Sequence, residues 1–90
     1  MNKADLIEQI AQAAEISKSA AERAVDALVV AVKSSLRKDE QVTLVGFGTF
    51  YAGKRAARVG RNPKTGAQVQ ISAARMPKFR AGKALKDAIN

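Results

Sequence analysis

The sequence contains no cysteine, no histidine and no tryptophan. Without cysteine there is no disulfide, no thiolate metal site and no cysteine nucleophile. Without histidine the chain lacks the commonest general base and the usual zinc ligand. Large side chains are also scarce, because 18 of the 90 residues are alanine and only four are aromatic. A core this thin in so short a chain needs further support, and we expect two chains to share one core.

Signals for catalysis, cofactors and membranes are missing as well. Gly46-Phe47-Gly48 lacks the third glycine of a dinucleotide-binding fingerprint, and no Lys-Ser or Lys-Thr follows Gly66, as a phosphate-binding loop requires. No apolar run approaches the roughly 20 residues of a membrane span, and the N-terminus has no signal-peptide core. We therefore expect a cytoplasmic protein that is not an enzyme. It should need no metal and no cofactor, and it should bind neither a small-molecule substrate nor a membrane.

Acidic residues are absent from one long segment. The net charge is +8 and the isoelectric point is near 10.3. Residues 53–80 carry eight Lys or Arg and no Asp or Glu, whereas residues 1–52 are nearly neutral. A segment of 28 residues with one sign of charge attracts polyanions. Nucleic acid is the first candidate, and an anionic membrane surface is the second.

Apolar residues at helical spacing predict two antiparallel helices at the N-terminus. Asn2 can cap the first helix, and Glu15-Ile16-Ser17 breaks its pattern. The second helix should start near Ser17 or Ser19, because Ser19 and Glu22 fit a capping box, and it should run for about 18 residues. The candidates for the shared core on these helices are Leu6, Ile10, Leu28, Val29, Val32 and Leu36.

Beyond residue 40 the hydrophobic period changes from that of a helix to that of a strand. Gln41–Val45 and Thr49–Ala52 flank Gly46–Gly48, which predicts a hairpin. Pro77 should limit strand pairing where the chain returns. Ala81–Ile89 should form a short helix, so the fold class is α+β. Its inward residues should be Ala84, Leu85, Ala88 and Ile89. The predicted core extends to Leu44, Phe47, Phe50 and Phe79, although aromatic rings could also stack on bases.

Residues 53–75 have few large apolar side chains and predict a two-stranded ribbon. Asn62-Pro63 and Thr65-Gly66 are turn dipeptides that place the tip between them. An isolated ribbon is marginal in water, so we expect a protruding arm that is mobile until it meets its ligand. From the residues alone, Pro63 is more readily a turn proline than a wedge. The wedge reading stays open, because a rigid apolar ring at the end of an arm can unstack bases.

The spacing of Gly46-Phe47, Phe50, Arg55, Arg58, Gly60, Asn62-Pro63 and Thr65 resembles the signature of the HU/IHF family of DNA-bending nucleoid proteins. The resemblance runs from residue 1 to residue 90. It implies an intertwined homodimer, in which two helices per chain form a base and small antiparallel sheets form a saddle. Residues 1–52 would supply the dimerisation helices and sheet. Residues 53–76 would form the DNA-binding β-arm, and residues 77–90 the return strand and C-terminal helix.

The resemblance also implies which residues contact DNA. Two arms would enter the minor groove, where Pro63 would intercalate. The implied DNA-binding residues are Lys3, Lys54, Arg55, Arg58, Arg61, Asn62, Pro63, Lys64, Arg75, Lys78, Arg80, Lys83 and Lys86.

We therefore expect a histone-like protein of the nucleoid that binds, bends and compacts duplex DNA with little sequence specificity. Bent, nicked or gapped DNA should bind tightest, because part of the cost of distortion is already met. The partner chain would be a second copy or a paralogous subunit of the same family. Three alternatives stay open, namely a site-specific IHF-type subunit, an RNA- or ribosome-associated protein and a general polyanion or membrane-surface binder.

Overall fold

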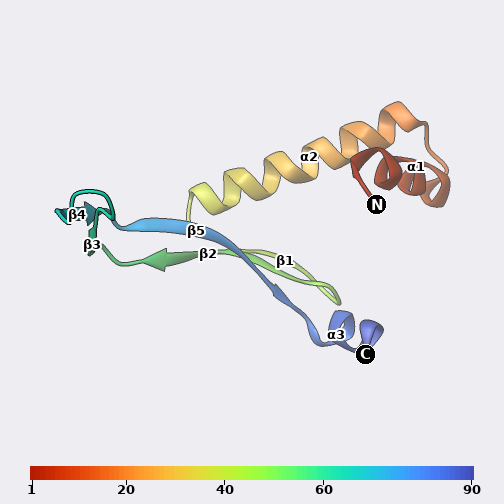
Figure 1. Ribbon diagram of the computed structural model, residues 1–90. Coiled ribbons are helices and arrows are strands. Elements are labelled where there is room, and N and C mark those ends of the chain that lie inside the picture. The colour runs from red at the N-terminus through yellow and green to blue at the C-terminus, as the bar shows by residue number, and fades with distance from the viewer. The chain divides into compact units, whose positions relative to one another are not determined.

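The computed structural model describes residues 1–90 as two compact units, residues 1–34 and residues 35–90. Two helices, α1 (Lys3–Ala14) and α2 (Lys18–Arg37), form the first unit, and α2 ends just inside the second. The second unit contains strands β1 (Val42–Leu44), β2 (Gly48–Arg55), β3 (Arg58–Arg61), β4 (Gln68–Ile71) and β5 (Ala74–Ala81), and helix α3 (Lys83–Ile89) (Figure 1). This order confirms the predicted α+β class. No helix is long and apolar enough to cross a membrane.

Capping residues fix both helix starts in the first unit. The Asn2 side chain accepts a hydrogen bond from the Asp5 backbone N–H at 2.9 Å, and the Asp5 carboxylate accepts one from the Asn2 N–H at 3.2 Å. The predicted cap is therefore confirmed. The Ser19–Glu22 capping box is wrong, because Ser17 Oγ accepts the Ala20 N–H at 3.0 Å. With the cap already at Ser17, Ser19 falls within the first turn of α2, which is 20 residues long.

The buried core of a single chain is very small. The buried apolar side chains are those of Ala11, Ala21 and Val25, and no large side chain is fully buried. Leu6, Leu28 and Val29, which we expected in a shared core, are 39%, 47% and 44% exposed. Burying one valine and two alanines cannot offset the entropy of ordering two helices. The isolated chain thus leaves large apolar side chains exposed on both units.

The second unit is built on an antiparallel sheet of strand order β1-β2-β5. The turn between β1 and β2 contains Gly46 at φ +83°, a value that favours glycine, so the predicted hairpin is confirmed. Successive side chains alternate between the two faces of the sheet. The apolar face carries Val42, Leu44, Phe50 and Phe79. The Phe79 ring lies 4.9 Å from that of Phe50 and 5.3 Å from that of Phe47.

The end of the chain differs from the prediction in two respects. Strand β5 runs straight through Pro77, which pairs with Ala52, so Pro77 does not limit pairing. Proline is tolerated in this position because β5 is an edge strand of the sheet. Helix α3 starts at Lys83, since Ala81 belongs to β5 and Gly82 is the N-cap. Ile89 is 78% exposed, and of the residues expected to point inward only Leu85 is even half-buried.

The ribbon forms as predicted, but it is interrupted at its base. Strands β3 and β4 pair only with each other, from Arg58↔Ile71 to Arg61↔Gln68. Residues 56–57 and 72–73 separate this pair from β2 and β5. The ribbon follows one end of the β2–β5 ladder, and α3 follows the other end of β5 (Figure 1).

Candidate nucleic-acid interface

The face of the sheet opposite the phenylalanines is polar and cationic. Arg80 stands opposite Thr49, and Lys78 stands opposite Tyr51. The Arg80 guanidinium lies 5.2 Å from the centre of the Tyr51 ring. Lys78 crosses Gly53, where a Cβ atom would come within 2.8 Å of Lys78 Cε, so this glycine leaves room for the lysine. We call this surface the polar strand face, and it consists of Thr43, Thr49, Tyr51, Gly53, Arg55, Met76, Lys78 and Arg80.

Lys54 and Arg75 do not share that face. They form a cross-strand pair on the side of Phe50 and Phe79. With Arg55 and the adjoining alanines they line a hollow of about 290 Å³. Each arginine is also bonded within the chain, because Arg75 Nη1 donates to the Leu36 carbonyl at 3.3 Å and Arg55 Nη2 donates to the Ser72 carbonyl at 3.2 Å. Arg75 lies in β5, but its guanidinium meets the last turn of α2, where the helix dipole favours a cation. Arg75 therefore has a structural role besides any contact with an anion.

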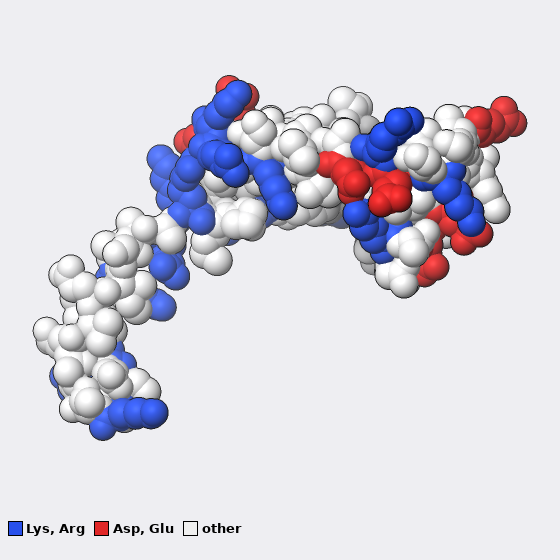
Figure 2. All heavy atoms as spheres, turned by 90° about the horizontal axis from the view of Figure 1, so that it is seen from above, with Lys and Arg blue, Asp and Glu red and all other residues white.

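The two ribbon arginines project to opposite faces. The register places Arg58 with Gly60, Val69 and Ile71, and Arg61 with Gln68 and Gln70. Both arginines and Lys64 are exposed. Figure 2 shows Lys and Arg but no Asp or Glu on the part of the molecule that β3 and β4 form. A ribbon charged on both faces can meet phosphates on either side of it.

The ribbon tip is closed by a compact set of hydrogen bonds. The Asn62 N–H donates to the Ala67 carbonyl at 2.9 Å, and the Gly66 N–H donates to the Asn62 carbonyl at 2.8 Å. The Asn62 side chain accepts the Lys64 N–H at 2.9 Å, and Gly66 adopts φ +71°. Asn62, predicted as a DNA contact, therefore also builds the turn. Pro63 is held exposed at its end.

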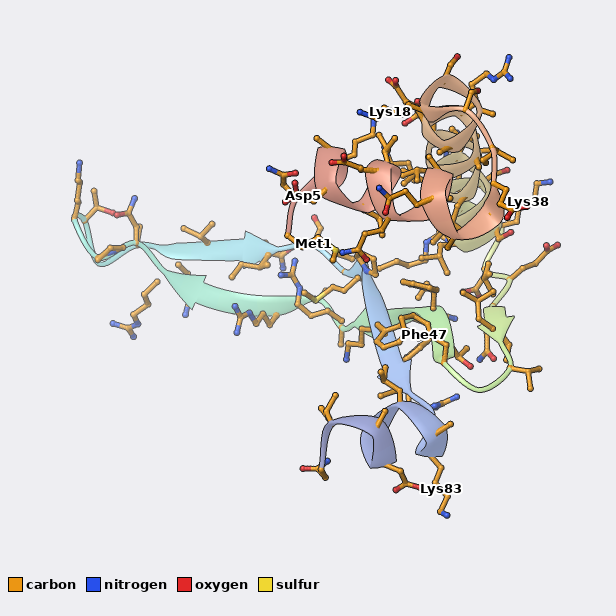
Figure 3. The ribbon with its side chains drawn as sticks, turned by 90° about the vertical axis from the view of Figure 1, so that its right-hand side faces the viewer. Met1, Asp5, Lys18, Lys38, Phe47 and Lys83 are labelled. Carbon is orange, nitrogen blue, oxygen red and sulfur yellow. The ribbon has the colours of Figure 1, made fainter.

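The three helix cations lie apart from the ribbon in the sequence. Lys3 contacts Asp26 at 2.7 Å, and Lys83 contacts Asp87 at 3.4 Å. The hydrogen bond to Asp26, and then the charge of that carboxylate, raise the pKa of Lys3 above its ordinary value. Lys83 projects away from α3 into solvent (Figure 3), and Lys86 is exposed. All three are available to an anion, but Lys3 and Lys83 must exchange a carboxylate partner for it.

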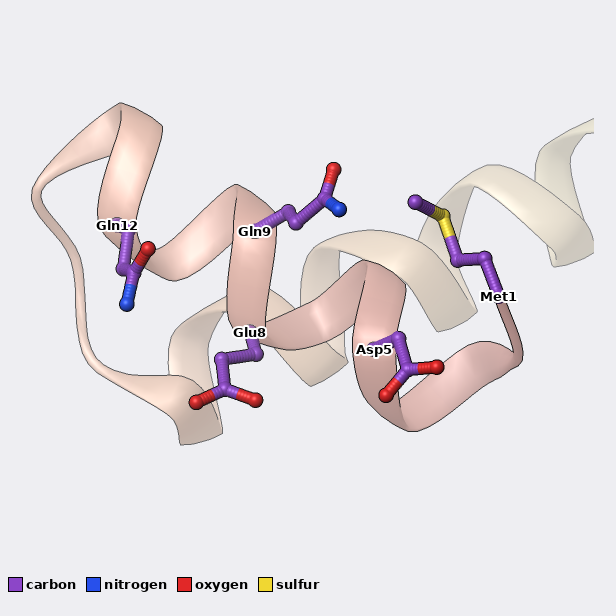
Figure 4. A pocket seen from close by; sticks show the side chains of 5 residues that line it. All are labelled: Met1, Asp5, Glu8, Gln9 and Gln12. Carbon is purple, nitrogen blue, oxygen red and sulfur yellow. The ribbon is translucent and has the colours of Figure 1, made fainter.

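A hollow on α1 offers a different chemistry. It measures about 310 Å³ and is lined by Met1, Asp5, Glu8, Gln9 and Gln12 (Figure 4). Its two carboxylates would repel a phosphate. No cluster of three or more Asp or Glu residues could hold a metal ion. The cationic strands, and not this hollow on α1, are therefore the candidate interface with nucleic acid.

Comparisons with known proteins agree with this assignment. The family model described as bacterial DNA-binding protein matches residues 1–90. DNA-binding protein HU-beta of Neisseria meningitidis (strain Z2491) is 64% identical over 89 residues, which are 99% of this chain and all of the relative. HU-beta of Escherichia coli K12 is 59% identical over the whole of both chains. The Anabaena HU–DNA cocrystal structure matches with a TM-score of 0.91 at 38% identity, over 99% of this chain and 97% of that one.

A helical hairpin, a small sheet and a basic ribbon thus define a bacterial DNA-binding protein. Within that class, the chain belongs to the HU family. The predicted resemblance and the predicted histone-like DNA-binding function are confirmed, and the chain is a binding protein and not an enzyme.

Three residues of the polar strand face were not predicted from the sequence, namely Thr43, Thr49 and Tyr51. Their alternation with the core residues Leu44 and Phe50 was the available signal. Alternation alone could not show that Lys78 and Arg80 join them, because that depends on the register between β2 and β5.

Proposed function

We propose that this chain bends and compacts duplex DNA without sequence specificity, by inserting its ribbon into the minor groove with Pro63 as an intercalating wedge. The observation that carries the proposal is the tip, where Pro63 stands exposed on a turn that its neighbours hold closed. A wedge must keep its shape while it separates stacked bases. A proline ring on a bonded turn meets that requirement.

The dimensions of the groove explain why bending accompanies binding. The minor groove of B-form DNA is about 6 Å wide. Two paired strands lie about 4.8 Å apart before their side chains are added. The groove must therefore widen, and a kink provides the opening at a cost of a few kcal/mol per unstacked step. Nicked or gapped DNA has lost part of its stacking already, so it should bind more tightly than an intact duplex.

Low sequence specificity follows from the side chains on the ribbon. The minor groove distinguishes mainly A·T from G·C pairs. The proposed contacts are mostly Lys and Arg, which bind phosphates of any sequence. These proposed contacts are Lys3, Lys54, Arg55, Arg58, Arg61, Asn62, Pro63, Lys64, Arg75, Lys78, Arg80, Lys83 and Lys86. Such a protein would work in the cytoplasm, at the nucleoid.

The proposed active form is a homodimer, or a heterodimer with a paralogous subunit. A hollow of about 530 Å³ in the first unit is lined by Leu6, Val25 and Val29 together with Met1, Asn2, Lys3 and Asp26. Apolar side chains of a partner would fill it and complete the core. We assign residues 1–52 to dimerisation, 53–76 to the DNA-binding arm and 77–90 to the return strand and C-terminal helix. The proposed shared core is Leu6, Ile10, Leu28, Val29, Val32, Leu36, Leu44, Phe47, Phe50 and Phe79.

Replacing the wedge tests the proposal directly. Pro63→Ala should reduce the bend of an intact duplex, measured by energy transfer between dyes at its ends, while affinity for a gapped duplex falls less than twofold. Lys64→Gln is the matched control, because it removes a charge beside Pro63 and keeps the ring. It should lower affinity for both duplexes equally and leave the bend unchanged. If Pro63→Ala lowered affinity equally for the intact and the gapped duplex, Pro63 would not act as a wedge.

A further inference from the structure

Three polar side chains lie side by side across the polar strand face. Thr43 of β1 pairs directly with Thr49 of β2, and Thr49 pairs directly with Arg80 of β5. The two threonine hydroxyl oxygens are 3.2 Å apart, within hydrogen-bond distance. Thr43 and Arg80 are exposed and Thr49 is half-buried, so a ligand can reach the row from solvent.

Counting protons shows what the threonine pair can still bind. Each hydroxyl has one proton to donate and two lone pairs to accept. The bond between Thr43 and Thr49 uses one of the two protons, whichever residue donates it. One O–H remains free, and the bond within the pair polarises it and strengthens it as a donor. The pair therefore presents one strengthened donor beside the Arg80 guanidinium.

An aromatic ring holds the Arg80 guanidinium in position, and no acidic side chain neutralises its charge. Its guanidinium lies 5.2 Å from the centre of the Tyr51 ring, within the range of a cation–π contact. No carboxylate forms an ion pair with Arg80, and the sequence has no Asp or Glu between Glu40 and Asp87. The charge of Arg80 is therefore held in place without being neutralised.

We infer that Thr43, Thr49 and Arg80 form a binding site for one phosphate group of the nucleic-acid backbone, with Tyr51 as a positioning residue for Arg80. Arg80 supplies the charge, and the threonine pair supplies a neutral donor that fixes where the phosphate lies. Contacts of this kind set the position of a protein on a duplex without reading its sequence. The inference rests on the proposed function, which already counts Arg80 among the DNA contacts, and adds the two threonine hydroxyls of the sheet as partners of Arg80 at one phosphate.

The salt dependence of binding separates the contribution of the Arg80 charge from that of the threonine hydroxyls. Thr43→Val/Thr49→Val removes both hydroxyls and keeps the side-chain shape, so affinity for an intact duplex should fall about three- to tenfold. The slope of log K against log salt should not change, because no cation is lost. Arg80→Gln should lower affinity and also make the slope shallower by about 0.9. Each single Thr→Val variant leaves one hydroxyl free to donate. Its loss of affinity for the intact duplex, on a logarithmic scale, should therefore be less than half that of the double variant.

Matched variants control for structural damage. Thr43→Ser/Thr49→Ser keeps both hydroxyls and should bind within twofold of the parent protein. Tyr51→Phe keeps the ring and should also bind like the parent, whereas Tyr51→Leu should weaken binding with the slope retained. If the folded double valine variant, checked by circular dichroism, binds like the parent protein, the hydroxyls serve only the sheet and the inference is wrong. If the parent protein itself fails to bind the duplex, the proposed function fails instead.

Discussion

At the scale of single residues, Glu15 is held in an unfavourable backbone conformation. It follows α1 with φ 55° and ψ 47°, the left-handed region, and its N–H bonds back to the last turn of the helix. A Cβ atom in this region costs roughly 1 kcal/mol, which glycine avoids. Glu15→Gly should therefore raise the melting temperature by about 4–8 °C in thermal unfolding followed by circular dichroism.

The matched control for this prediction is Glu15→Ala. It removes the same charge but keeps the Cβ atom, so its melting temperature should stay close to that of the parent protein. An equal rise for both variants would assign the effect to charge. No rise for glycine would contradict the left-handed conformation at residue 15.

At the scale of elements, the β2–β5 ladder depends on a close approach at Gly48. This residue is buried, and a Cβ atom there would lie 2.5 Å from Phe79 Cζ and 2.6 Å from the Arg80 carbonyl oxygen. The ring could turn, but the backbone oxygen could not move without breaking the ladder. Gly48→Ala should therefore lower the free energy of unfolding by about 1–3 kcal/mol, measured by urea denaturation.

Gly60→Ala is the comparison for Gly48→Ala. Gly60 lies in β3, and a Cβ atom there would meet the flexible end of Ile71 at 3.1 Å. Its effect should be under 1 kcal/mol, since the isoleucine can adjust. A tolerated alanine at residue 48 would show that the register of β2 with β5 is not the one described.

The elements that the sequence predicted are those with local signals. Asn2, Gly46 and the Asn62–Gly66 turn mark boundaries through their own backbone or hydrogen-bonding preferences, and all three were located correctly. Ser17 and Ser19 offered equivalent caps two residues apart, so only the structure could choose between them. Pro77 was misjudged because its effect depends on whether β5 is an edge or a central strand.

The distribution of cations over the sheet could not be predicted for a similar reason. Lys54 and Arg55 are neighbours in sequence but point to opposite faces, and the β5 cations join one face or the other according to a long-range register. The signature residues gave the composition of the site. They could not show that Arg75 bonds to the end of α2 or that Arg80 lies beside two threonine hydroxyls.

At the scale of the whole molecule, the uncovered apolar surface makes the proposed dimer testable. If two chains complete one core, the unfolding midpoint should rise with protein concentration. Leu28→Glu should destroy the dimer, measured by sedimentation equilibrium. Val30→Glu is the control, because Val30 is 64% exposed and is not among the predicted shared-core residues, so the dimer should survive it. A midpoint independent of concentration, with a monomeric parent protein, would contradict the shared core.

Binding of this protein to DNA should bend the duplex. The most direct measurement titrates the protein into an intact duplex, the same duplex with a central gap and a matched RNA duplex, following anisotropy and end-to-end energy transfer over a salt series. We expect the gapped DNA to bind tightest, the DNA ends to approach, and log K to fall by about 0.9 per phosphate neutralised for each unit of log salt. Equal or tighter binding of RNA, with no approach of the DNA ends, would show that the protein is not a DNA-bending protein.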